Sequence, residues 1–127
     1  MGGVTSPNDN ISLSELTSGD ELLTLTDFAE RMGVPVTRVG DLLTAHRLVV
    51  GDIDGKRRIP ALLLDDDGTI NKYASGAITV LVDGGFNDDE ILAFLFTEDD
   101  SLPGRPIDNL HGHGAREVIR RAQAMAF

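Results

Sequence analysis

The chain lacks cysteine and tryptophan altogether, and its 127 residues include only one tyrosine. Without thiols it can form neither a disulfide nor a thiolate metal site, which fits a reducing compartment. Long apolar runs are also missing, since stretches such as IPALLL and AITVLV are far too short to span a bilayer. The first ten residues have neither the basic nor the apolar region of a secretory signal. We therefore expect a cytoplasmic protein that does not enter a membrane.

Positive charge is scarce. The chain has 11 lysines and arginines against 21 aspartates and glutamates, for a formal net charge of -10. Residues 1–20 carry -3, residues 61–127 carry -7, and only residues 21–60 are neutral. A polyanion would be attracted by this central block alone, because exposed charges are screened beyond about 8 Å at physiological salt.

The central block predicts two short helices joined by a tight turn. Thr24 and Asp27 fit a capping box at the start of the first helix, and Gly33 suits its end. Pro35 is suited to the first position of the second helix. In that helix Val36, Val39, Leu42 and Leu43 recur at the spacing of one buried face.

A β-hairpin is predicted next, because Asp54-Gly55 is a strong two-residue turn signal. A helix pair followed by a basic hairpin is typical of winged helix-turn-helix domains, which read DNA with the second helix and hold phosphates with basic groups. Glycine at position 40 and the acid at position 41 count against this reading, and a plain helical hairpin beside a solvated ribbon is the alternative. The candidate DNA-binding residues are Thr37, Arg38, Asp41, Thr44, Arg47, Lys56, Arg57 and Arg58.

The remainder is predicted to be mainly helical after a third short strand at 61–64. Helices are expected over about 72–83, after the cap Asn87, and from 115 to the end, with a loop-rich connector over 97–114. We expect Val118, Ile119, Ala122 and Met125 to face inward from the last helix. The fold class is thus α+β, mainly α with a small β-hairpin. A flexible tail (1–20) would precede a winged helix-turn-helix (21–64) packed on a C-terminal helical domain (65–127).

No motif indicates catalysis, a cofactor or a metal. His111 and His113 in HGHG have no nearby partner cluster, so a loop is the plainer interpretation. DDDG at 65–68 lacks the spacing and the bidentate glutamate of a calcium loop and is expected to be a turn. Neither a nucleophile elbow nor a phosphate-binding loop is present. We therefore expect a binding protein and not an enzyme.

From about Leu22 to Phe127 the chain resembles a family of small actinobacterial winged helix-turn-helix DNA-binding regulators. The resemblance rests on GVPVTRVGDLL, RLVV, RRIP, LVDGGFNDDEILAFLFTEDDSL, GRPIDNLHGH and above all REVIRRAQAMAF. It implies binding to double-stranded DNA without enzymatic activity. A mycobacterial member is phosphorylated by a membrane-anchored Ser/Thr kinase on a threonine of its tail. By this resemblance Thr5 is the candidate phosphorylation site and such a kinase a candidate partner.

The C-terminal block also resembles the toxin-binding domain of some antitoxins. The matching letters are Leu95, Phe96, Leu102, Gly104, Arg105, Pro106, Ile107, Asp108 and Leu110. This second resemblance implies an interaction module for a small protein partner, with or without DNA binding.

Overall fold

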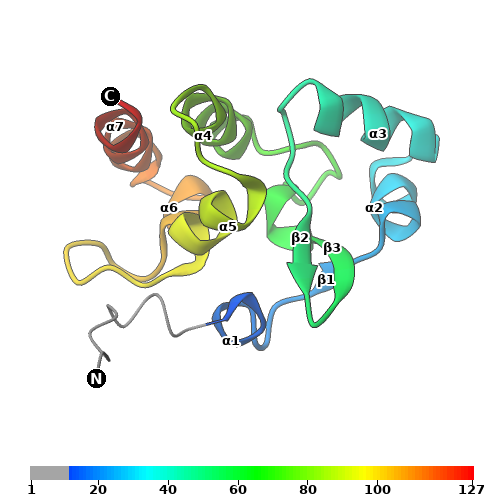
Figure 1. The fold of residues 1–127 in the computed structure, drawn as a ribbon, viewed down its shortest axis with the longest axis horizontal. Helices are drawn as coiled ribbons and strands as arrows, with labels where there is room; N and C mark the ends of the chain where they lie inside the picture. The colour runs from blue at the N-terminus through cyan, green and yellow to red at the C-terminus, as the bar shows by residue number, and fades with distance from the viewer. Residues whose placement is uncertain (1–11) are drawn as a thin grey trace.

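A computed structural model describes residues 12–127, and it separates the helices into two groups around a small sheet (Figure 1). One group is α2 (Leu25–Met32) and α3 (Val36–Thr44). The other is α4 (Lys72–Asp83), α5 (Asp88–Phe96), α6 (Pro106–Leu110) and α7 (Ala115–Ala126). The α+β fold class is confirmed. Among the described residues, no helix is long and apolar enough to cross a membrane.

The sheet is antiparallel, in the order β1 (Leu22–Leu23), β3 (Lys56–Pro60), β2 (Gly51–Ile53). β2 and β3 form the expected hairpin, with Ile53 opposite Lys56 on either side of the turn. The strand that completes the sheet is not the one predicted at 61–64. Ala61–Leu63 form a single 3-10 turn after Pro60, and Leu22 of β1 pairs with Pro60 instead. Pro60 ends β3, the middle strand, and the chain turns directly after it because the N–H of Leu64 donates to the carbonyl of Ala61 and closes the 3-10 turn.

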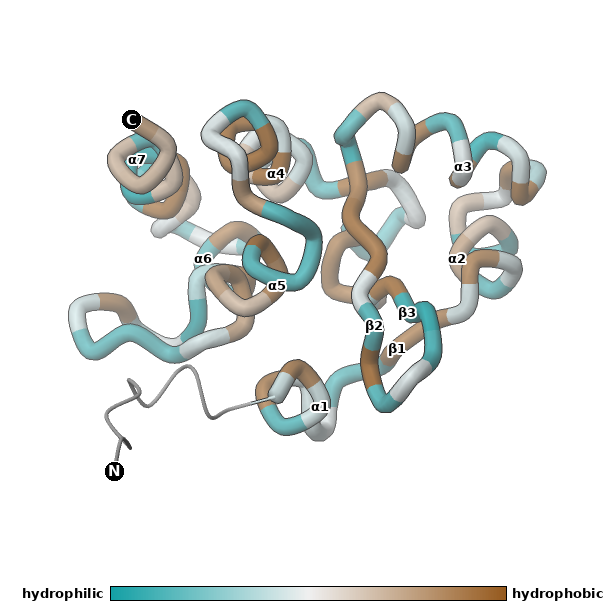
Figure 2. The backbone as a smooth tube through the Cα atoms, in the orientation of Figure 1, coloured by the Kyte–Doolittle hydropathy of each residue, from teal (hydrophilic) through white to brown (hydrophobic). Residues whose placement is uncertain are grey.

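One continuous core joins the two helix groups. Phe28 and Val39 from α2 and α3 belong to the same buried cluster as Leu81, Leu95 and Val118 of the C-terminal helices. Figure 2 shows the hydrophobic segment that descends into β2 at the centre of the molecule, whereas the hairpin tip is hydrophilic. The apolar periodicity of each helix is satisfied by burial in this shared core.

The junction also has polar contacts. The Asp88 and Asp89 carboxylates at the start of α5 accept hydrogen bonds from the backbone N–H groups of Val50 and Asp52, at 3.3 and 3.4 Å. These acids therefore cover the free edge of β2, which would otherwise offer unpaired N–H groups. The His111 ring nitrogen Nε2 lies 2.6 Å from the carbonyl of Leu62. The hairpin and the C-terminal helices are thus held in a defined arrangement.

The structure corrects the C-terminal part of the predicted flexible tail. Residues 13–16 form α1 (Leu13–Leu16), whose N-cap Ser12 accepts from the backbone N–H of Glu15. Thr17 is buried, and Leu13 and Leu16 pack against the core. Single apolar residues among polar neighbours gave little sign of this, because their partners are distant in the sequence. Residues 1–11 lie outside the described part of the chain.

Three smaller predictions were wrong. Pro35 is the N-cap of α3 and not its first helical residue. Val36 and Met125, both expected to face inward, are 45% and 46% exposed. The connector over 97–114 contains the short helix α6. The other inward positions of α7 hold: Val118 and Ala122 are buried and Ile119 packs against the core.

Arg105 ties the segment after α1 to α6. It binds Asp20 at 2.7 Å and Asp108 at 3.1 Å, and its guanidinium lies 5.1 Å from the centre of the Phe96 ring. The hydrogen bonds that Arg105 donates to Asp20 and, to a smaller extent, to Asp108 raise the pKa of Arg105, and the bond to Asp108 lowers the pKa of that carboxyl. Two parts of the chain that are 85 residues apart are thereby held together.

This network makes stability depend on acid pH. A carboxyl whose pKa is lowered on folding contributes stability above its unfolded pKa, about 4, and the contribution is lost as the pH falls through the folded pKa. We expect the free energy of unfolding in urea to decline below about pH 4, and the Arg105→Gln variant to show a shallower decline. Arg116→Gln, which removes an arginine without an ion pair in residues 12–127, is the control and should keep the native profile. Identical profiles for the native chain and Arg105→Gln would contradict the assignment.

Candidate nucleic-acid interface

α3 presents one polar face to solvent. Val39 is its single fully buried residue, while Leu42 and Leu43 are half-buried. The remaining positions leave the polar side chains outward: Thr37, Arg38, Asp41 and Thr44 are all exposed. The helix is nine residues long, about 13 Å at 1.5 Å per residue. A segment of this size and polarity can enter the major groove, which is about 12 Å wide.

Gly40 lies within α3 and is not required by the packing. A Cβ atom built there would meet nothing within 4 Å, and the residue is helical. We expect Gly40→Ala to stabilise the protein by roughly 0.5–1 kcal/mol, because glycine loses more backbone entropy than alanine in a helix. Thermal unfolding measures this, and an unchanged or lower midpoint would contradict it. If α3 enters DNA at this position, the same variant will bind duplex DNA more weakly although it is more stable.

α2 supports α3 from below. Thr24 caps α2 by accepting from the backbone N–H of Asp27 at 3.0 Å, which confirms the predicted N-cap. The predicted return bond from the N–H of Thr24 to Asp27 is not formed among the described residues, so the capping box is incomplete. Gly33 ends it with φ 74°, the left-handed conformation that glycine adopts at least cost. Phe28 and Ala29 are buried on the inner face. The turn over 33–35 therefore holds α3 against α2 and leaves the outer face of α3 free.

α3 ends in a hydrogen-bonded motif that the sequence did not suggest. His46 has φ 59°, and its N–H donates to the Leu43 carbonyl while the N–H of Arg47 donates to that of Leu42. A helix end closed by these two hydrogen bonds normally has glycine at the residue with left-handed φ. The carbonyl of His46 also accepts from the Thr79 hydroxyl of α4 at 3.0 Å. Tertiary contacts thus fix the backbone of Arg47, whose side chain is exposed.

The hairpin β2–β3 has the geometry of a wing. Asp54 and Gly55 both have positive φ, 55° and 78°, so the turn is of the type whose twist matches its strands. Lys56 and Arg57 are exposed, whereas Arg58 is half-buried and donates to the carbonyl of Arg57 at 2.8 Å. Neighbouring residues of a strand point to opposite faces. The three bases therefore surround the hairpin and do not form a single row.

α1 braces the tip of this wing. The Ser14 hydroxyl donates to a carboxylate oxygen of Asp54 at 3.0 Å. A Cβ on Gly51 would lie 2.6 Å from Leu92 of α5, so the base of β2 is packed against the C-terminal helices. Contacts from two elements distant in the sequence therefore hold the hairpin at both ends.

The candidate residues include most of the cations that have no acidic partner. Within residues 12–127, ion pairs to carboxylates engage Arg31, Arg105, Arg120 and Arg121. The lysines and arginines with no such pair in that range are Arg38, Arg47, Lys56, Arg57, Arg58, Lys72 and Arg116. An unpaired cation can bind an external anion without first losing an internal partner. Five of these seven lie in the proposed interface.

Two family models match this chain, one in its N-terminal half and one in its C-terminal half. The family model described as the winged helix-turn-helix domain of DNA-binding protein Rv2175c matches residues 12–64, and the Rv2175c C-terminal domain of unknown function matches residues 72–126. DNA-binding protein Rv2175c of Mycobacterium tuberculosis is 38% identical over 134 residues, covering 91% of this chain and 92% of the relative. The chain belongs to the Rv2175c family. The NMR structure of Rv2175c has a TM-score of 0.80 and 35% identity, with 100% of this chain and 97% of that chain covered.

The winged helix-turn-helix model of the Rv2175c family begins at residue 12, which agrees with the contacts of α1. The two family models leave residues 65–71 between them. The proposed boundary after residue 64 borders this segment, which begins with DDDG. Asp67 accepts from the hydroxyl and the N–H of Thr69, which lowers the pKa of its carboxyl. The segment is a turn, as expected.

His111 and His113, in the C-terminal domain, do not lie in a cluster of metal-ligating side chains within the described residues. His111 contacts the carbonyl of Leu62 and lies 3.4 Å from a carboxylate oxygen of Asp65. His113 is exposed. Within residues 12–127 there is no group of three or more histidine, aspartate or glutamate side chains that could hold a metal ion. His111 therefore has a structural contact between the two domains.

Proposed function

We propose that this protein binds double-stranded DNA through α3 and the wing and regulates transcription in the cytoplasm. The observation that carries the proposal is the set of five cations on a winged helix-turn-helix that have no acidic partner within residues 12–127, in a chain of net charge -10. Its relative is named a DNA-binding protein, and the relationship extends over nearly the whole of both chains.

Seven of the eight candidate residues have a role that suits their chemistry; the eighth, Thr44, donates its hydroxyl to the Gly40 carbonyl at 3.0 Å. Thr37 and Arg38, in the first turn of α3, approach base edges. Asp41 accepts from a cytosine amino group, a base contact that suits a carboxylate in the major groove. The remaining lysine and arginine side chains bind phosphates, because Lys and Arg at the rim of an interface fix its register on the duplex. These residues are Arg47, Lys56, Arg57 and Arg58.

A fluorescence-anisotropy titration of the full chain against labelled duplex DNA tests the proposal. We expect binding that weakens between 50 and 200 mM salt, with a slope of log K against log salt of about -0.9 per phosphate contact. Unlabelled competitor duplexes of different sequence separate specific from general affinity. Absence of binding at the lower salt concentration would overturn the proposal.

Phosphorylation of the N-terminal tail by a Ser/Thr kinase regulates this binding, with Thr5 as the acceptor. Thr5 lies outside the described residues, seven positions before the cap Ser12, so the chain can separate them by at most about 25 Å. α1 in turn contacts the wing through Ser14 and Asp54. A phosphate adds about -1.5 to -2 charges, which would compete with DNA for the wing cations. Mass spectrometry after incubation with a cognate kinase checks this, and finding no phosphate on residues 1–20 would remove the idea.

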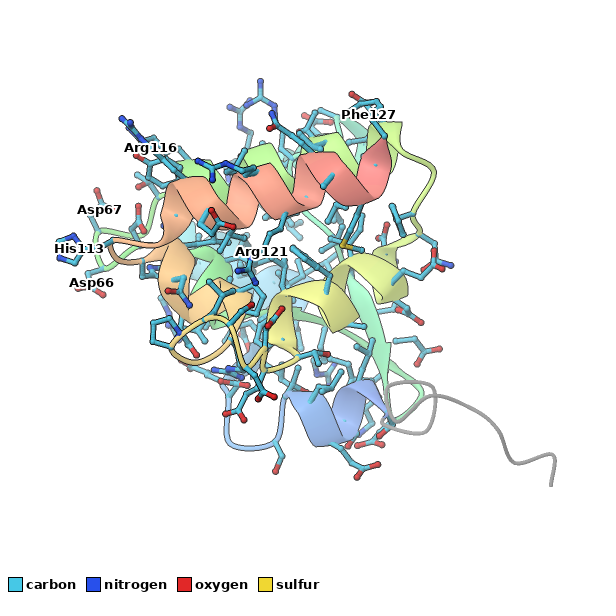
Figure 3. All side chains as sticks on the ribbon, turned by 90° about the vertical axis from the view of Figure 1, so that its left-hand side faces the viewer. Asp66, Asp67, His113, Arg116, Arg121 and Phe127 are labelled. Carbon is cyan, nitrogen blue, oxygen red and sulfur yellow. The ribbon has the colours of Figure 1, made fainter. Side chains whose placement is uncertain are left out.

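A second candidate function is binding of a small protein partner by the C-terminal helices. The exposed apolar side chains Met125 and Phe127, at 46% and 89%, favour it. Met125 is in the last turn of α7, and Phe127 is its C-cap at the end of the helix (Figure 3). The residues that resemble the antitoxin domain do not form this exposed surface, since Phe96, Ile107 and Leu110 are buried. Affinity capture with the native chain and with a Met125→Asp/Phe127→Asp variant tests it. A stoichiometric small protein lost in the variant supports the candidate, and its absence from both contradicts it.

A further inference from the structure

We propose that the hollow between the end of α3 and the first turn of α4, flanked by Arg47 and Lys72, binds a backbone phosphate of DNA. The C-terminal domain would then be part of the DNA interface and not only a support for it. This inference rests on the proposed DNA binding and extends it to a domain for which the family description gives no function.

The lining of the hollow is positive in an acidic protein. It measures about 440 Å³ and contains no aspartate or glutamate. The four other surface hollows described all include carboxylates, such as Glu21, Asp65, Glu90 and Glu15. An anion entering this hollow therefore meets two cations and no carboxylate in its lining, although Ile70 and Lys72 also line the adjoining hollow, which includes Asp65. The lining residues are Leu42, Arg47, Ile70, Lys72, Ser75, Gly76 and Thr79.

The polar groups of the hollow are available. Arg47 and Lys72 are exposed, and neither forms an ion pair within residues 12–127. The Lys72 ammonium lies 5.2 Å from the centre of the Tyr73 ring, a contact that limits its rotamers without neutralising its charge. Ser75 lines the hollow and is 8% exposed, and its backbone carbonyl accepts from the Thr79 hydroxyl at 3.0 Å. Its own hydroxyl can donate to a ligand oxygen that enters the hollow.

The hollow has a fixed position relative to the outer face of α3. Leu42, which lines it, follows Arg38 by four residues and therefore lies on the same side of the helix. The bond from Thr79 to the carbonyl of His46 joins the two walls at 3.0 Å. Figure 1 shows α3 and α4 along the same edge of the molecule, with the turn that follows α3 between them. A duplex against the outer face of α3 would bring a flanking phosphate to this position.

The test compares Lys72→Gln with Arg116→Gln in the full chain. Both remove one exposed, unpaired cation, but Arg116 projects into solvent at the start of α7 and does not line the hollow (Figure 3). Anisotropy titrations with one labelled duplex at two salt concentrations give the affinity and the salt slope. We expect Lys72→Gln to weaken binding about threefold to tenfold and to reduce the slope by about 0.9, with Arg116→Gln within twofold of native. Lys72→Arg, which keeps the charge, should bind like the native chain.

The outcomes separate the two proposals. If the native chain binds and Lys72→Gln keeps its affinity and slope, the hollow is not a phosphate site, although binding by α3 and the wing stands. Equal losses in both glutamine variants would reduce the effect to net charge and overturn the site as well. If the native chain does not bind DNA at low salt, the proposed function itself fails.

Discussion

Replacing Lys56, Arg57 and Arg58 with glutamine is expected to weaken binding to duplex DNA roughly 100-fold, to a similar degree on every sequence. Hydrogen bonds to charged groups contribute more than neutral ones, and each 1.4 kcal/mol corresponds to a factor of ten. The slope of log K against log salt should become shallower by about 0.9 for each lost phosphate contact. Arg57→Gln and Lys56→Gln should have larger single effects than Arg58→Gln, since Arg58 is half-buried and donates to the Arg57 carbonyl.

The matched control removes the same number of charges elsewhere. Arg31, Arg116 and Arg120 are exposed and lie on α2 and α7, outside the wing. Their triple glutamine variant has the same formal net charge as the wing variant and should bind DNA within a few-fold of native. Equal losses in both variants, or unchanged binding in the wing variant, would show that the wing is not the phosphate-binding element.

Phe28→Ala is expected to destabilise the protein by about 3–5 kcal/mol. Phe28 is fully buried in the core beneath the helix pair. Removing a buried phenyl group loses its transfer free energy and leaves a cavity that the surroundings fill only in part. Since small domains are stable by only about 5–15 kcal/mol, this is a large fraction of the total. Urea unfolding at neutral pH gives the value directly.

Phe127→Ala provides the control for that variant. The same chemical change at a side chain 89% exposed should alter the free energy of unfolding by less than about 0.5 kcal/mol. DNA binding should be weakened in Phe28→Ala, because α3 depends on α2 for its orientation, and unaffected in Phe127→Ala. A Phe28→Ala variant as stable as the native chain would mean that α2 does not pack as described.

The helix pair and the wing were readable from local signals. The Thr24 cap, the left-handed Gly33 and the Asp54-Gly55 turn each depend on residues within a few positions of one another. The capping box of Asn87 and Glu90 belongs to the same class. Such features follow from backbone and capping chemistry that neighbouring residues carry themselves.

Features that depend on distant residues were not readable. The third strand of the sheet is β1, whose Leu22 pairs with Pro60. Two helices separate β1 from β3 in the sequence, and local patterns predicted the third strand at 61–64 instead. Asp20 falls within the predicted tail, but it binds Arg105 across the molecule. Lys72 appeared only as an early residue of a helix, and its position beside Arg47 is visible only in the folded chain.

The sequence by itself determined the order and type of most helices, the wing turn, the strong acidity and the family, because these depend on local periodicity, turn chemistry and composition. Tertiary structure decided which cations are free. Arg105 and Arg121 are held by acids, whereas Arg38, Lys56 and Arg57 have no acidic partner in residues 12–127. Charge pairing depends on distances between elements far apart in the chain, and those distances exist only once the common core has formed.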